Sequence, residues 1–267
     1  MPVAKVSDIN MYYEVLGDGP PVVLLSGWSL ADRAFGKLVP HLKDHFTCIR
    51  VDHRNMGRSD APEGPASIEQ MSDDVAGLLD HLGHDTAQIF GAGGMGALIA
   101  MEFAIRHGAR TRSLHLGSPS LKVDNFLAEM MEVWRQLRHL DVRLWAREVT
   151  LWCFTPGTYE RNRELPAHAF EARAGENTFP SPNSYDRIVD AYVKYDATDR
   201  AAQITAPTLI TTAGIEDMIT GPRFAKAVHD TIAGSRLHVF EGTSHGYGAE
   251  AEAEFSKLAV EWLMLHR

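Results

Sequence analysis

Two residues in the last quarter of the chain have the types and positions of a catalytic base and its acidic partner. Asp217 follows the apolar segment PTLITTA, and His245 follows the segment RLHVFEG. Both segments are predicted strands, and ligands bind beyond the carboxyl ends of parallel strands. A carboxylate against one imidazole nitrogen fixes the tautomer and stabilises the imidazolium that forms on proton uptake. We interpret the pair as a general base. The alternative is that His245 is one surface histidine among 13 and that Asp217 is a turn residue.

The segments that must position these residues alternate between strand and helix. The first of them, VAKVSDINMYYEVLGDG, predicts an antiparallel hairpin, and the apolar run Val22–Leu25 is typical of the interior of a parallel sheet. Residues 32–44 have helical spacing. Ser67-Ile68-Glu69-Gln70 has the form of a capping box, so a helix is expected from there to Gly83. This order predicts an α/β fold with a mostly parallel sheet and helices on both faces.

The alternation breaks between Leu121 and Ala206, a span rich in Trp, Arg, Glu, Met and Leu at helical spacing. We predict a core domain of residues 1–120 and 207–267, with residues 121–206 inserted as a helical cap. Most aromatic residues of the cap should form its own core, while one or two face a pocket, and Trp152 is predicted to contact the substrate. These residues are Trp134, Trp145, Trp152, Phe154, Tyr159 and Phe170.

The stretch IFGAGGMGALIAMEF, residues 89–103, has the form of a nucleophile turn without a nucleophile. An apolar strand ends in glycines and an apolar helix follows at once, which is where Gly-x-Ser-x-Gly lies in serine hydrolases of the α/β type. No Ser, Cys, Asp or Thr occurs within the stretch. Alignment by the helix places the missing nucleophile at Gly94, which we favour, and alignment by the strand places it at Gly93.

Four local patterns make the whole chain resemble the α/β-hydrolase-fold superfamily, in particular its enol-lactonase and aminoacrylate-hydrolase-like group. They are VVLLSGWS (22–29), DHRNMGRSD (52–60), TAGIEDMIT (212–220) and EGTSHGYG (241–248). The resemblance implies an eight-stranded sheet with a cap, His245 and Asp217 as catalytic residues, and an oxyanion hole from the backbone N–H groups of Trp28 and Met95. Asn55 replaces the first glycine of the family's Asp-x-Arg-Gly-x-Gly-x-Ser loop.

The resemblance and the missing hydroxyl together favour an enzyme that works without a serine. Loss of a triad serine costs on the order of a millionfold in kcat, so an acyl-enzyme mechanism is excluded. A positioned imidazole and a backbone oxyanion hole remain. They could activate water against an ester, lactone or carbamate, or deprotonate an acidic C–H or a phenol. Ser26, Gly27, Ser29 and Ser118 lie at the same predicted sheet edge and are candidate substrate-binding residues.

Two other functions stay open. The glycine-rich turn also resembles the N-myc downstream-regulated family, whose members are regarded as binding or signalling modules. Alternatively, the chain is an ordinary serine esterase or carbon–carbon hydrolase in which the nucleophile was changed to glycine. Gly91, Gly93 and Gly96 also satisfy Gly-x-Gly-x-x-Gly, but this motif occurs at a late strand, which is not the place of a dinucleotide site.

Composition excludes several classes of partner. With 26 basic and 35 acidic residues the formal charge is −9, and no block of five basic residues occurs, so nucleic acid and anionic membranes are not expected partners. No apolar run approaches the length of a membrane span or of a signal peptide's apolar region. We expect a cytoplasmic protein, monomeric or homodimeric, that acts on a small molecule without a cofactor or metal. Cys48 and Cys153 are expected to be buried and unbridged.

Overall fold

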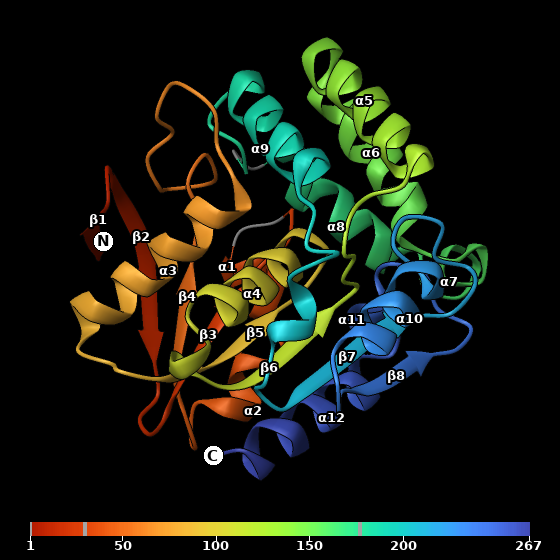
Figure 1. Ribbon diagram of the computed structural model, residues 1–267. Coiled ribbons are helices and arrows are strands. Elements are labelled where there is room, and N and C mark those ends of the chain that lie inside the picture. The colour runs from red at the N-terminus through yellow and green to blue at the C-terminus, as the bar shows by residue number, and fades with distance from the viewer. Residues whose placement is uncertain (1, 29–30, 176–177) are drawn as a thin grey trace.

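The computed structural model describes residues 2–28, 31–175 and 178–267, and an eight-stranded sheet forms its centre (Figure 1). The spatial order is β1-β2-β4-β3-β5-β6-β7-β8. β1 pairs antiparallel with β2, and β2 pairs antiparallel with β4, whereas all later neighbours are parallel. The strands are β1 (Val3–Val6), β2 (Ile9–Leu16), β3 (Pro21–Leu25), β4 (Thr47–Val51), β5 (Ala87–Gly91), β6 (Thr111–Gly117), β7 (Thr208–Ala213) and β8 (Arg236–Phe240).

Helices cover both faces of this sheet. One face packs on α3 (Ile68–Leu82), α4 (Met95–Arg106) and α10 (Pro222–Thr231), and the other on α1 (Ala31–Phe35), α2 (Val39–Leu42) and α12 (Glu252–Leu265). The side chains of β3 divide between the two cores, with Val23 and Leu25 in the first and Val22 and Leu24 in the second. A strand covered on both faces needs the unbroken apolar run that the sequence shows. Shorter elements are η1 (Gly108–Arg110), η2 (Ala201–Gln203) and α11 (Tyr247–Glu250).

Local sequence signals explain where the main helices begin and end. The Ser67 hydroxyl accepts a hydrogen bond from the backbone N–H of Gln70 at the start of α3, and Gly83 ends that helix in the left-handed conformation. The predicted helix over residues 32–44 is instead two short helices, α1 and α2. Pro40 explains the break, because a proline ring clashes with the carbonyl four residues earlier, here that of Gly36.

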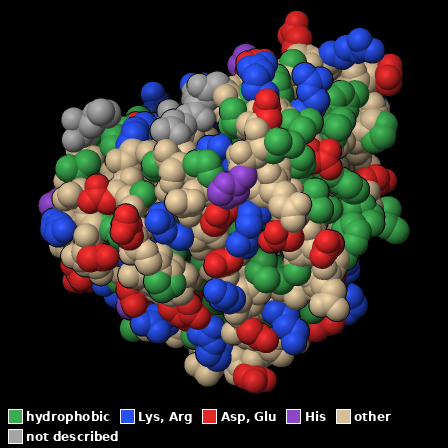
Figure 2. Space-filling view, turned by 90° about the horizontal axis from the view of Figure 1, so that it is seen from above, with side chains coloured by type: hydrophobic (Ala, Val, Ile, Leu, Met, Phe, Trp, Pro, Cys, Tyr) green, Lys and Arg blue, Asp and Glu red, His purple; other side chains and the backbone are tan. Residues whose placement is uncertain are grey.

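Between β6 and β7 the chain forms a helical layer above the carboxyl edge of the sheet (Figure 1). Its helices are α5 (Asn125–Leu140), α6 (Val142–Cys153), α7 (Pro156–Arg161), α8 (Glu164–Gly175) and α9 (Pro182–Lys194). All five lie within residues 121–206, the span predicted to be a cap. Figure 2 views the molecule from this side, where acidic, basic and hydrophobic side chains intermingle and hydrophobic ones gather along one margin.

The predicted α/β architecture is confirmed: the chain has a mostly parallel eight-stranded sheet with helices on both faces. The amino-terminal hairpin pairs Val6 with Ile9 across the turn. Both cysteines are buried and unbridged. Within the described residues, no helix combines the length and apolar character needed to cross a membrane.

Candidate active site

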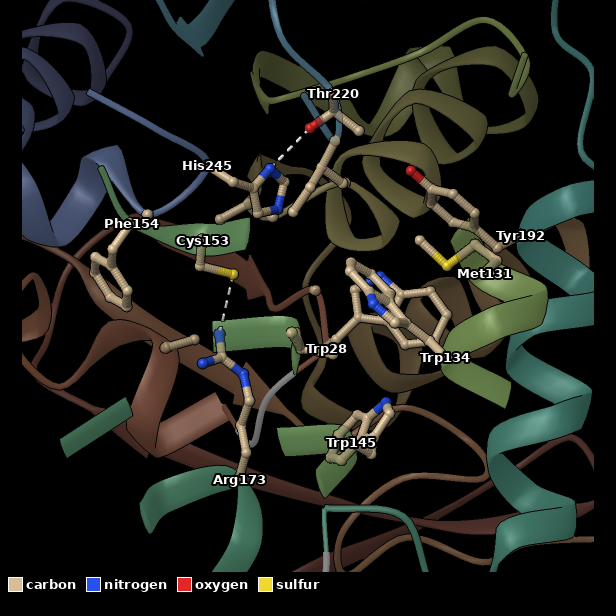
Figure 3. Close-up of a pocket in the computed structure, with 18 of the residues that line it drawn as sticks. Trp28, Met131, Trp134, Trp145, Cys153, Phe154, Arg173, Tyr192, Thr220 and His245 are labelled. Carbon is tan, nitrogen blue, oxygen red and sulfur yellow. Dashed lines mark hydrogen bonds between the residues drawn. The ribbon is translucent and has the colours of Figure 1, made fainter. Parts of the chain in front are cut away.

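His245 and Asp217 are brought together at the carboxyl edge of the sheet, 28 residues apart in the chain. His245 Nδ1 lies 3.2 Å from Asp217 Oδ2 and 2.9 Å from Thr220 Oγ1. The Thr220 hydroxyl donates to the same Asp217 oxygen at 3.4 Å, which leaves Thr220 Oγ1 free to accept from the imidazole. Both partners therefore favour the tautomer with the proton on Nδ1, so Nε2 is left as the basic nitrogen. In Figure 3 the ring edge away from Thr220 faces the cavity.

The loop after β7 holds Asp217 as an anion. The carboxylate is 2 % exposed, and its Oδ1 accepts the backbone N–H groups of Ile219 at 2.8 Å and Thr220 at 3.0 Å. Burial raises the pKa of Asp217, but interaction with His245 and the two backbone N–H donors outweigh this and bring the pKa below its ordinary value. A buried carboxylate that stays ionised is suited to stabilise an imidazolium.

At the turn between β5 and α4, three glycines allow close approach of backbone to backbone. A Cβ on Gly91 would lie 2.3 Å from the Gly96 carbonyl oxygen, and one on Gly96 would lie 2.2 Å from the Leu25 carbonyl oxygen. A Cβ on Gly27 would lie 2.0 Å from the carbonyl oxygen of Gly93. No side chain could occupy these positions without moving the backbone, so the glycines allow β3 to approach the turn.

Gly93 and Gly94 both have positive φ, of 66° and 64°, and Gly94 is the residue immediately before α4. A Cβ on Gly94 would meet the Tyr192 hydroxyl at 3.1 Å, whereas a Cβ on Gly93 would meet only the backbone of Gly27, at 3.5 Å. The position that precedes the helix therefore faces a phenolic hydroxyl from α9 of the helical layer.

A cavity of about 180 Å³ lies over the turn (Figure 3). Gly27, Gly93, Gly94 and His245 line it from the sheet side. Its other walls are largely aromatic and come from Trp28 and the helical layer: Trp134, Trp145, Phe154, Tyr185 and Tyr192, with Met131, Cys153 and Arg173 between them. Neither the Trp28 nor the Met95 backbone N–H donates to another group within the described residues, so both remain available for a ligand.

The structure corrects several predicted substrate contacts. Trp152 does not line the cavity: it packs against the hydrophobic core, and its indole N–H donates to Glu148 at 2.8 Å. Ser118 is buried beneath the site in contact with Tyr247, and Ser26 is buried at the end of β3, where its carbonyl oxygen contacts His53. Neither serine lines the cavity. Ser29 lies outside the described residues.

Sequence reasoning missed several side chains of this site, among them Thr220, Tyr192, Cys153 and Arg173. Thr220 could have been noticed, because it lies three residues after Asp217 in the same loop. The other three belong to the helical layer, where no local pattern marks a residue as facing the cavity. Among the described residues, no group of three or more His, Cys, Asp or Glu side chains could hold a metal ion.

Comparisons with known proteins agree with this architecture. Residues 20–247 match the sequence model of the alpha/beta hydrolase fold family. RutD of Azorhizobium caulinodans, named as a carbamate hydrolase, is 26 % identical over 97 % of this chain and 97 % of its own. The 3-oxoadipate enol-lactonase 2 of Acinetobacter baylyi is 26 % identical over 96 % of this chain and 94 % of its own.

The solved structures give the same result. The enol-lactonase from Burkholderia xenovorans LB400 superposes with a TM-score of 0.89 and 25 % identity, covering 98 % of this chain and all of that one. The family match extends from the strand before Gly27 to the loop of His245, and so includes every element that borders the cavity from the sheet side. The chain therefore belongs to the α/β-hydrolase fold family and is a hydrolase-like enzyme.

Proposed function

We propose that this protein hydrolyses a small carbonyl compound, such as an ester, lactone or carbamate, without a serine nucleophile. The observation that carries the proposal is the orientation of His245: its Nδ1 side is held by Asp217 and Thr220, while the ring lines a cavity floored by Gly93 and Gly94. A base that faces a cavity without a hydroxyl at the turn can act on water or on the substrate itself.

In the proposed reaction, His245 Nε2 takes a proton from a water molecule as the water oxygen attacks the carbonyl carbon. The backbone N–H groups of Trp28 and Met95 bind the oxyanion, and one such donor contributes roughly 3 kcal/mol of transition-state stabilisation. Asp217 stabilises the imidazolium. As the intermediate collapses, the proton moves from Nε2 to the leaving oxygen or nitrogen, which restores the neutral base. The same base could instead remove a proton from an acidic C–H or a phenol, and the oxyanion hole would then stabilise the anion that forms.

Tyr192 supports a mechanism without serine. Burial raises the pKa of its phenol, so the hydroxyl stays protonated and can donate a hydrogen bond to the attacking water. A serine at position 94 would have its Cβ 3.1 Å from this hydroxyl, which is tight. This disfavours a serine esterase whose nucleophile was simply replaced by glycine. The contact of Asp217 with a histidine at the cavity wall likewise disfavours a purely binding or signalling role.

A comparison of two histidine variants tests the proposal. With 4-nitrophenyl acetate, dihydrocoumarin and a phenyl carbamate as probes, His245→Ala should lower kcat/KM by about 10²–10⁴-fold for whichever probe is turned over. His139→Ala is the matched control, because that imidazole lies on α5, where it contacts Asp186. Ser118→Ala should also keep most activity. Equal losses in all three variants, or no turnover of any probe by the wild type, would contradict the proposal.

The absence of a covalent intermediate is a second readout. Incubation with a fluorophosphonate that labels serine hydrolases, under the conditions of the activity assay, should leave the intact mass of the protein unchanged. A stoichiometric adduct on any hydroxyl would instead identify a surrogate nucleophile and overturn the serine-independent mechanism.

A further inference from the structure

Among the described residues that line the cavity, Arg173 carries the one guanidinium, and none is Asp, Glu or Lys. It projects from α8. Burial raises the pKa values of Cys153, Tyr185 and Tyr192, so these groups stay neutral. A positive charge in the substrate cavity contrasts with the formal charge of −9 of the whole chain.

No carboxylate among the described residues pairs with this guanidinium. Its hydrogen bonds go to the Thr150 hydroxyl at 2.9 Å, the Ala169 carbonyl oxygen at 3.5 Å and the Cys153 sulfur at 3.5 Å. These bonds use at most three of the five N–H donors of a guanidinium, so further donors of Arg173 remain for a ligand. A planar guanidinium can bind a carboxylate with two parallel hydrogen bonds.

Arg173 and the proposed base line the same cavity and are connected through Cys153. Arg173 Nη2 donates to the sulfur of Cys153, whose own carbonyl oxygen accepts the N–H of Gly246 at 2.6 Å, next to His245. Figure 3 shows Arg173 reaching toward Cys153 from the side of the cavity opposite Thr220. A cavity of about 180 Å³ holds only a small ligand, and both Arg173 and His245 line it.

The approach to the cavity carries charges of both signs. A second hollow shares Gly93, Arg173 and His245 with the first and opens between α1, α8 and α12. Arg33 and Lys37 line this outer part together with Glu252, which pairs with Lys37 at 3.0 Å. Among the described residues, Arg173 is the basic residue with a guanidinium common to both hollows.

We infer that the substrate is a compact carbonyl compound that also carries a carboxylate, and that Arg173 binds this carboxylate while the carbonyl faces His245. This inference rests on the proposed function for the reaction, but the anion site itself can be tested without turnover. The apolar aromatic walls strengthen the interaction, because a charge-assisted hydrogen bond gains in a medium of low dielectric constant. Arg173 is then a specificity-determining residue.

Binding of a matched pair of probes tests the site. Phenylacetate and phenylacetamide have nearly the same shape and differ in charge, and titration calorimetry gives a Kd for each. Wild-type protein should bind phenylacetate at least about tenfold more tightly than the amide, as expected for hydrogen bonds to a charged group. Arg173→Met should abolish this preference and Arg173→Lys should retain part of it.

Arg147→Met is the control, because Arg147 is an exposed guanidinium on α6 over Phe170 and does not line the cavity. A thermal unfolding curve for each variant separates loss of the anion site from loss of the fold. Equal affinity of the wild type for both probes, no detectable binding of phenylacetate at millimolar concentration, or an unchanged preference in Arg173→Met would overturn the inference.

Cys153 offers an independent reporter of charge at the same place. Its alkylation by iodoacetate and by iodoacetamide, followed by peptide mass spectrometry, gives a ratio of rates in which the basicity of the thiol cancels. The ratio of the iodoacetate rate to the iodoacetamide rate should fall severalfold in Arg173→Met, and an unchanged ratio would count against the site. If the preference for anions is present but His245→Ala does not affect turnover, the proposed function fails while the carboxylate site stands.

Discussion

Tyr192 and Gly94 define the space in which a nucleophile is missing. The phenolic hydroxyl lies 3.1 Å from the position of a Cβ on Gly94, and its removal would leave ring carbons at 3.7 Å and 3.8 Å as the nearest atoms. Gly94 already has the positive φ that a nucleophile turn requires. A residue other than glycine would adopt this conformation at a cost of about 1–3 kcal/mol. The proposed oxyanion donors and the base are close to this position.

We therefore expect Gly94→Ser to create an ordinary serine esterase only when space is made for it. The double variant Gly94→Ser with Tyr192→Phe should show burst kinetics and an acyl-enzyme with 4-nitrophenyl acetate, and Gly94→Ser alone should be much weaker. Gly93→Ser should form no acyl-enzyme, because its Cβ faces the backbone of Gly27. An acyl-enzyme at position 93 and none at position 94 would move the turn by one residue and refute the assignment.

At the scale of elements, a buried ion pair ties the loop after β4 to helix α3. Arg54 donates to both carboxylate oxygens of Asp74 at 2.6 Å and 2.7 Å, with both side chains almost fully buried. In the same loop Asn55 has a φ of 64°, a conformation that asparagine tolerates better than most residues, so it replaces the family's glycine there. The loop runs beside β3, which carries Gly27 and Trp28 to the cavity.

Neighbouring aspartates on α3 provide a matched test of this anchor. Asp74→Ala leaves the Arg54 guanidinium buried without its main partner and should lower the free energy of unfolding by about 3–5 kcal/mol. Asp73→Ala removes solvent-exposed contacts with Arg106 and His107 and should cost less than about 1 kcal/mol. Urea denaturation of both variants measures the difference. Similar losses in the two would show that the buried pair is not the anchor.

At the scale of the whole molecule, two fully buried histidines make stability depend on pH. Burial lowers the pKa of His53 to about 4 and that of His115 to about 3. His115 stacks on Phe90 and contacts the Thr211 hydroxyl at 2.9 Å, beneath the carboxyl edge of the sheet. In the unfolded chain these histidines bind protons below their ordinary pKa of 6.5, whereas in the folded chain they stay neutral until the pH is much lower. The free energy of unfolding is therefore fully retained above pH 6.5 and falls as the pH drops toward the folded pKa values.

Replacement of one of these histidines should flatten that dependence. Between pH 7 and pH 5 the wild type should lose about 2 kcal/mol of unfolding free energy per buried histidine. His115→Phe keeps the ring stack and cannot be protonated, so its loss over the same range should be smaller by about that amount. Parallel pH profiles for the wild type and the variant would contradict the assignment.

The sequence alone determined the features that depend on neighbours along the chain. The β1 and β2 hairpin, the caps of α3, the apolar run of β3 and the missing hydroxyl at the β5 turn follow from periodicity and from the conformations open to glycine, serine and proline. The positions of Asp217 and His245 after two strands were likewise readable, because parallel strands bring their carboxyl ends to one edge of the sheet.

Only the tertiary structure decided which side chains face the cavity. Trp134 and Trp145 line it whereas Trp152 does not, although all three belong to amphipathic helices of the same layer. The contact of Tyr192 with the turn and the place of Arg173 in the cavity wall depend on how α8 and α9 pack over the sheet. Helical spacing identifies a buried face, but the rotation of one helix against another decides whether that face meets protein or substrate.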